Sequence, residues 1–165
     1  MSLITKQGMI NLKEKLISLE QEEKEALNAL IVARGFGDFS ENAELEAARN
    51  WLDRINNDQQ KTKAIISQAV VFNVNNIINE NVVGFGACVM VEDENDKIFE
   101  YKIVNETESN LKEGKISSTS PIAKALFSKK IDDECVFSAP SGQKSYLIKK
   151  IDYSWLKWFY CYLFF

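Results

Sequence analysis

The first 75 residues alternate apolar and polar positions with the spacing of a coiled coil. Between Thr5 and Ala33 there is no proline and only one glycine, and a seam of positions recurs at steps of four and three. Glu23 is the polar interruption of this seam, and Thr5 offers the hydroxyl that a helix N-cap prefers. The pattern predicts a helix about 43 Å long, at about 1.5 Å per residue. The seam consists of Leu12, Leu16, Leu19, Glu23, Ala26, Leu30 and Ala33.

A turn follows this helix and leads into a second one. Gly35 and Gly37, followed by Asp38, mark the turn. From about Glu41 to Ala69 the coiled-coil spacing returns with fewer apolar residues. Because the turn is short, the two helices are expected to pack antiparallel, as a hairpin over residues 1–75 with its tip near residues 35–41. The second predicted seam consists of Glu44, Ala48, Trp51, Ile55, Asp58, Thr62, Ile65 and Ala69.

The rest of the chain has the pattern of a small sheet domain. Ser120 and Pro121 are typical of the N-cap and first position of a helix, which we expect to end near Phe127. An asparagine-rich segment near residues 73–81 separates this part, residues 76–153, from the hairpin. The predicted fold class is therefore α+β, with a mostly antiparallel sheet and one short helix after the hairpin. The expected strands are 82–91, 99–104, 135–138 and 145–151, the last two joined by a turn at Ser141-Gly142.

Composition excludes several kinds of site. The chain has 165 residues, of which 45% are hydrophobic, and a net charge of -4, which argues against gripping bare nucleic acid through bulk positive charge. Without histidine there can be no Ser-His-Asp triad and no histidine metal site. Cys88, Cys135 and Cys161 form no CxxC pair, which excludes a zinc finger or ribbon. With no signal peptide and no apolar run long enough to span a bilayer, we expect a soluble cytoplasmic protein with reduced thiols.

The hairpin tip carries the densest chemistry in the sequence. Asp38, Glu41 and Glu44, with Asn42 between them, fall within seven residues. One interpretation is a capping box, with Asp38 at the N-cap and Glu41 at the third helical position. The other interpretation is that the tip extends to a site on a partner, where its carboxylates bind Mg²⁺, which prefers oxygen ligands. Two or three carboxylates are too few for a dedicated site, so they would complete a site that a partner supplies.

Residues around this tip resemble the signature of bacterial Gre transcript-cleavage factors, most closely the A-type members with their small basic patch. The similarity extends over about residues 3–153. It runs through Ala33-Arg34, Gly37 to Glu44, Ala47-Ala48-Arg49, the first-helix positions Thr5, Gly8, Leu12, Leu16 and Leu19, the strand-like Val83 to Ala87, the segment Ser118 to Leu126, and Asp132-Asp133.

The resemblance implies a coiled-coil hairpin followed by an FKBP-like domain that binds the rim of the secondary channel of RNA polymerase. The hairpin would enter the channel, reach the 3′ end of nascent RNA in a backtracked complex and stimulate the polymerase's own cleavage of that end. The family's two catalytic carboxylates correspond to Asp38 and Glu41, which would hold Mg²⁺ jointly with the polymerase and orient the attacking water. Asn42 and Glu44 would support the tip. Arg34 and Arg49 correspond to basic positions that would contact RNA or the channel wall, if they are not simply solvated.

The same resemblance implies what the isolated protein lacks. It would be an accessory factor and no enzyme by itself, would bind no metal tightly without the polymerase, and would use neither zinc nor a membrane.

The sequence departs from the family at three places. Gly35-Phe36 is more apolar and flexible than the family norm. Leu45 stands where the family usually has an aromatic residue, which puts a stacking role there in doubt. Beyond Tyr153, where the family fold is expected to be complete, residues 154–165 include seven aromatic side chains. We expect an extension without a function. The alternatives are packing on the C-terminal domain or contact with a membrane interface.

Three other classes of function fit parts of the sequence. A secondary-channel inhibitor of the same fold would bind polymerase without promoting cleavage, and the presence of Asp38 and Glu41 argues against it. A peptidyl-prolyl isomerase or chaperone rests on the FKBP-like fold alone and leaves the hairpin unexplained. A purely structural coiled coil leaves the sheet domain unexplained. A cleavage assay on a backtracked elongation complex separates these classes.

Overall fold

The computed structural model describes residues 2–35, 43–73, 75, 77, 79–139 and 142–156. By its internal packing the chain separates into two compact units. One unit, called here the hairpin unit, comprises residues 9–69. The other, called the sheet unit, combines the residues up to Gly8 with those from Val70 onward. Each unit is described by itself.

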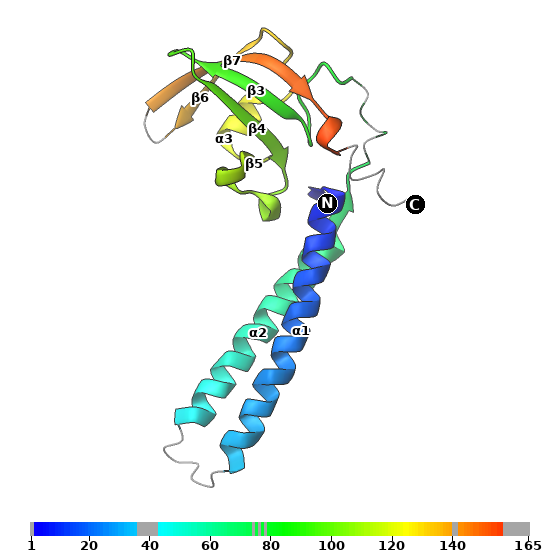
Figure 1. Cartoon of the computed structure of the whole chain (residues 1–165), viewed down its shortest axis with the longest axis vertical. Coiled ribbons are helices and arrows are strands. Elements are labelled where there is room, and N and C mark those ends of the chain that lie inside the picture. Colours follow the sequence, from blue (N-terminus) through cyan, green and yellow to red (C-terminus); the bar gives the residue numbers. More distant parts are fainter. Residues whose placement is uncertain are drawn as a thin grey trace. The chain divides into compact units, whose positions relative to one another are not determined.

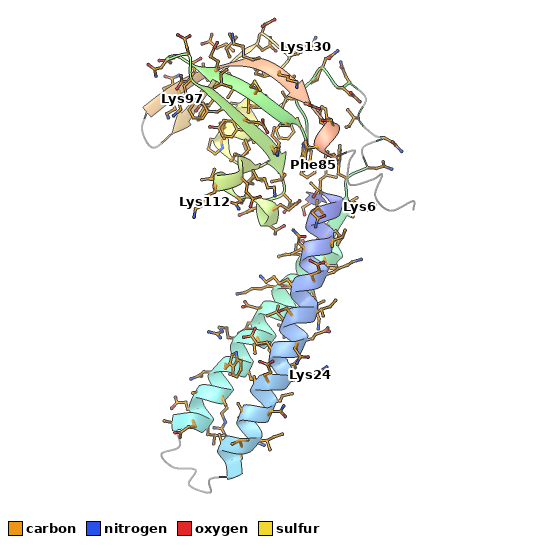
Figure 2. All side chains as sticks on the ribbon, viewed as in Figure 1. Lys6, Lys24, Phe85, Lys97, Lys112 and Lys130 are labelled. Carbon is orange, nitrogen blue, oxygen red and sulfur yellow. The ribbon has the colours of Figure 1, made fainter. Side chains whose placement is uncertain are left out.

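Two long helices, α1 (Lys6–Gly35) and α2 (Ala43–Gln68), form the hairpin unit, and they lie side by side and antiparallel (Figure 1). This confirms the predicted hairpin. Every position of the seam predicted for α1 is at least partly buried, and Leu19, Ala26 and Ala33 are buried. The outer surface carries polar side chains such as the exposed Lys24 (Figure 2), together with some exposed apolar ones, among them Ile17, Ile31 and Val32. The spacing of apolar residues in α1 therefore predicted correctly which face packs.

The seam predicted for α2 was partly wrong. Ala48, Ile55 and Thr62 are buried as expected, but Glu44 is exposed and its neighbour Leu45 is buried. In the same way Gln59 is buried more fully than Asp58. Neighbouring residues such as Glu44 and Leu45 lie on either side of the centre of the packed face, and the position of α1 decides which of them is covered. The spacing of residues along α2 does not reveal the position of α1.

A five-stranded sheet, in the order β5-β4-β3-β7-β6, forms the centre of the sheet unit. Neighbouring strands are antiparallel except for β4 and β5, which are parallel. The short helix α3 (Pro121–Leu126) begins as predicted, with the hydroxyl of Ser120 accepting a hydrogen bond from the Ala123 N–H at 3.3 Å. Together with the hairpin, this confirms the α+β fold class. The strands are β3 (Cys88–Asp93), β4 (Ile98–Val104), β5 (Lys115–Ser117), β6 (Glu134–Ala139) and β7 (Gly142–Asp152).

The predicted strand 82–91 was wrong in its first half. Gly86 has a φ of +81°, which an extended strand cannot contain, and the paired strand begins only at Cys88. Three short strands had no visible pattern in the sequence, because three residues are too few to show an alternation. They are β5 and the pair β1 (Ser2–Ile4) and β2 (Ala69–Val71).

The first turn of α1 is held within the sheet unit. The Thr5 hydroxyl accepts a hydrogen bond from the Gly8 N–H at 3.0 Å, which confirms Thr5 as the N-cap. The Thr5 N–H donates to the Glu108 carboxylate at 3.0 Å, and the Thr5 hydroxyl donates to the other oxygen of that carboxylate. Glu108 lies in the short 3-10 helix η2 (Glu106–Glu108). A Cβ atom at Gly8 would lie 2.2 Å from the Glu108 carboxyl carbon, so only glycine leaves this carboxylate its place.

The core of the sheet unit extends past Tyr153. The Trp155 indole N–H donates to the Gly86 carbonyl at 2.9 Å, and Leu156 is buried among the core side chains. A Cβ atom at Gly86 would come within 2.4 Å of a Leu156 methyl group, which shows how closely the two pack. The expectation that the folded core is complete at Tyr153 was therefore wrong as far as Leu156. Residues 157–165 lie outside the described residues.

No helix in the described part of the chain is long and apolar enough to cross a membrane.

Candidate functional site

Three of the predicted tip residues lie outside the described part of the structure. Residues 36–42 separate the last residue of α1 from the first residue of α2, and they include Asp38, Glu41 and Asn42. Their roles therefore stay predictions. The structure describes what lies on either side of them, including Arg34, Glu44 and Arg49.

The two helix ends that flank the tip keep a packed seam. Ala33, three residues before the tip segment 36–42, is only 3% exposed, and Leu45, three residues after that segment, is 4% exposed. Ala48, one turn further along α2, is also buried. The helices thus remain packed up to the ends of the tip segment, so that the segment is attached at two ordered points. The side chain of Leu45 is buried in this packing, so it has no exposed face that could stack on a base.

The charged side chains beside the tip are exposed. Arg34 lies in the last turn of α1, and Glu44 lies in the first turn of α2. These signs suit the helix dipoles, because a cation is favoured at a C-terminus and an anion at an N-terminus. Arg49 is exposed on the next turn of α2. Their exposure leaves the three side chains accessible to a partner, while the dipole effect alone also accounts for the signs of Arg34 and Glu44.

The donor set at the tip is suited to a hard cation but incomplete. Asp38 and Glu41 supply carboxylate oxygens, the ligand type that Mg²⁺ prefers, whereas Mg²⁺ requires six oxygens in near-octahedral geometry. Among the residues that the structure describes, no group of three acidic or thiol side chains converges to hold a metal ion. Asp38 and Glu41 lie outside those residues, so a shared site, in which another molecule and water provide the remaining ligands, stays a prediction.

A polar contact inside the hairpin connects its two helices. Gln59 on α2 is 6% exposed, and its side-chain N–H₂ donates to the Glu23 carboxylate at 2.8 Å and to the Leu19 carbonyl at 3.4 Å. A second contact joins the Trp51 indole N–H to the Glu22 carboxylate at 2.8 Å. The sequence showed Glu23 as a polar interruption of the seam, but its partner was missed because Asp58, rather than Gln59, was assigned to the seam of α2.

The outer face of the sheet carries a shallow cavity without a catalytic group. Cys88 lies in it, beside Glu100, Lys102 and Trp155, with the Lys102 ammonium 5.8 Å from the centre of the Trp155 ring. Burial, followed by the hydrogen bond and negative charge of Glu100, raises the pKa of the Cys88 thiol to about 12. A thiol with that pKa is protonated at neutral pH and is a poor nucleophile.

Comparisons with known proteins point to one family over both units. The family described as "Transcription elongation factor, N-terminal" matches residues 2–71, and the family described as "Transcription elongation factor, GreA/GreB, C-term" matches residues 78–153. The chain is 38% identical over 147 residues to transcription elongation factor GreA of Zymomonas mobilis, covering 89% of this chain and 92% of that protein. It is 40% identical over 147 residues to GreA of Acidiphilium cryptum, covering 88% and 93%.

Among solved structures, the chain is similar to the GreA factor homolog 1 (Gfh1) protein of Thermus thermophilus. The two are 26% identical, the match covers 92% of this chain and 98% of that one, and the TM-score is 0.43. A superposition with that score supports no conclusion about function.

Proposed function

Because the chain belongs to the GreA/GreB family of transcription elongation factors, we propose that it binds bacterial RNA polymerase and stimulates cleavage of the 3′ end of nascent RNA in backtracked complexes. The observation that carries the proposal is the acidic tip segment, Gly37 to Glu44, which in the sequence connects the two packed helices α1 and α2. The protein is an accessory factor, and the polymerase performs the cleavage.

The tip residues would act on the attacking water. Asp38 and Glu41 would accept hydrogen bonds from that water and orient it toward the RNA phosphate, which is the positioning part of catalysis. When bound jointly with the polymerase, Mg²⁺ would supply the charge that activates the water and stabilises the leaving oxygen. Asn42 and Glu44 would hold the tip segment in place, Glu44 from the first turn of α2.

The rest of the chain would deliver the tip to its place of action. The sheet unit would bind the rim of the secondary channel, and the hairpin would enter the channel. Arg34 and Arg49, both exposed on the described turns beside the tip, would contact the extruded RNA or the channel wall. A contact with a phosphate would depend on the salt concentration, since it releases condensed counterions.

The test is a cleavage assay on a stalled, backtracked elongation complex formed with the cognate polymerase. The factor should shorten the RNA from its 3′ end and allow elongation to resume, and the factor without polymerase should leave the RNA intact. Binding without cleavage would instead indicate a secondary-channel inhibitor of the same fold. Absence of any binding to polymerase would contradict the proposal altogether.

A further inference from the structure

The apolar seam of the hairpin mixes large and small side chains. Three of its buried positions are alanines, namely Ala26, Ala33 and Ala48, and three are larger, namely Leu19, Leu45 and Ile55. Alanines form no distinct knobs, so the apolar packing that favours one alignment of α1 and α2 depends on a few larger side chains. Leu19 and Ile55 form a small cluster with Ala26, and it is the main apolar landmark along the described seam.

Gln59 adds a polar constraint on the register to this apolar packing. Its side-chain N–H₂ reaches across the hairpin to both the Leu19 carbonyl and the Glu23 carboxylate, and its oxygen lies 3.4 Å from the Lys63 ammonium. Gln59 is buried, so a register that separated it from Leu19 and Glu23 would leave a buried amide without partners, at a substantial cost. The buried Thr62 adds no such constraint, because its hydroxyl bonds to the Asp58 carbonyl within α2.

We propose that Gln59, together with Glu23, fixes the register of the hairpin and is thereby a positioning residue for the tip carboxylates Asp38 and Glu41. A single buried polar side chain is known to set the register of coiled coils. This inference rests on the proposed function, since it concerns the placing of those carboxylates. Gln59 itself lies five turns of helix from the tip and touches no reacting group.

The size of the effect follows from helix geometry. A slip of one residue moves one helix by about 1.5 Å along its axis, and it also rotates the face that the helix presents. The end of α1 would then move relative to the start of α2, and Asp38 and Glu41 lie between these two points in the sequence. A misplacement of about 1 Å in a catalytic group can cost on the order of 10²-fold in rate. Binding through the sheet unit would not change.

The test uses substitutions that break and restore the contact. Gln59→Glu removes the donor and places a second carboxylate against Glu23, whereas Glu23→Gln keeps an oxygen that can accept from Gln59. The double variant Glu23→Gln with Gln59→Glu restores one donor and one acceptor in reversed order. Gln60→Glu, the same change at the exposed neighbouring position, is the matched control.

Two quantities are measured for each variant: the cleavage rate at saturating factor and the factor concentration that gives half of that rate. For Gln59→Glu we expect the saturated rate to fall about 10- to 100-fold, while the half-saturating concentration changes less than about threefold. Glu23→Gln, Gln60→Glu and the double variant should stay within about fivefold of the native rate. If Gln59→Glu instead reduced the helicity of the hairpin, the saturated rate and the half-saturating concentration would change together, and the double variant would not restore either of them.

A second variant protects the test against failure to fold. Gln59→Leu keeps the site apolar and well packed, and it should be folded while leaving the register unspecified. Methyl NOEs from Ile55 should then spread beyond Leu19 and Ala26, and the saturated cleavage rate should fall. A native NOE pattern together with native cleavage would overturn the inference. If the native protein itself stimulated no cleavage, the proposed function and the positioning role would both fall, whereas the NOE pattern would still decide what sets the register.

Discussion

The two described thiols are protected by their surroundings in the sheet unit. Cys135 is buried in the core, and burial raises its pKa; Cys88 lies beside Glu100, and its pKa is raised to about 12. Because the thiolate is the reactive form, the reaction of Cys88 with a disulfide reagent should accelerate about tenfold per pH unit below that value and level off only above it.

The raised pKa of Cys88 predicts a slow reaction of this thiol in the native protein. In a Cys161→Ser chain at pH 8, Cys88 should react at least about tenfold more slowly than an ordinary thiol of pKa 9.0, because a smaller fraction of it is thiolate and the greater nucleophilicity of that thiolate offsets only part of the difference. Both remaining thiols should react at once after unfolding in guanidinium chloride. A rate with Ellman's reagent close to that of free cysteine in the native protein would contradict the described environment of Cys88.

At the scale of elements, the start of α1 depends on a residue far away in the sequence. Glu108 receives two hydrogen bonds from Thr5, and its negative charge stands at the positive end of the helix dipole. Gly8 leaves room for this carboxylate. Thr5, Gly8 and Glu108 thus form one cap at the N-terminus of α1, although Glu108 is distant from the other two in the sequence.

Replacing Glu108 should therefore destabilise the protein. Glu108→Ala removes a charged acceptor from the buried Thr5, so we expect a loss of about 1–3 kcal/mol in the free energy of unfolding. Glu106→Ala changes an exposed glutamate in the same 3-10 helix and should cost less than about 0.5 kcal/mol. Urea unfolding of both variants provides the comparison. Equal effects would show that the Thr5 contact contributes nothing specific.

Much of this architecture could be predicted from the sequence, and the misses have a common cause. The repeated spacing of α1 and the Ser120-Pro121 signal of α3 are local patterns, and both were correct. Three features were missed because they depend on residues far away in the sequence: the packing of Gln59 against α1, the contact of Glu108 with Thr5, and the burial of Leu156. A local sequence pattern does not reveal such contacts. At the site, Arg34 and Arg49 are exposed on the helices beside the tip, whereas Glu44 is exposed although it was assigned to the packed seam of α2. The roles of these three residues, and the placing of Asp38, Glu41 and Asn42, stay predictions.

At the scale of the whole molecule, the end of the fold can be located by truncation. Deleting residues 154–165 removes the Trp155 hydrogen bond and the buried Leu156, and it should cost about 3–5 kcal/mol in stability. Deleting residues 157–165 spares both contacts, and we expect this longer of the two truncated chains to unfold at nearly the native denaturant concentration. Equal stability of the two truncated chains would show that the core ends at Tyr153 after all.

In the proposed mechanism, two carboxylates at the hairpin tip carry the activity. The competing account is that Asp38 and Glu41 only cap the second helix, for which asparagine serves as well as aspartate. Under that account Asp38→Asn would change stability by less than about 1 kcal/mol and leave cleavage nearly normal.

The most direct measurement is the rate of RNA cleavage in backtracked complexes with Asp38→Asn and Glu41→Gln, each at a saturating concentration. Both changes keep the size of the side chain and remove its charge, so we predict rates about 10²–10⁴-fold below native, the scale of a lost catalytic group. Both variants should still compete with the native factor for polymerase, and Glu44→Gln should lose less activity. Near-native cleavage by both single variants would contradict the account and leave the capping box as the role of the motif.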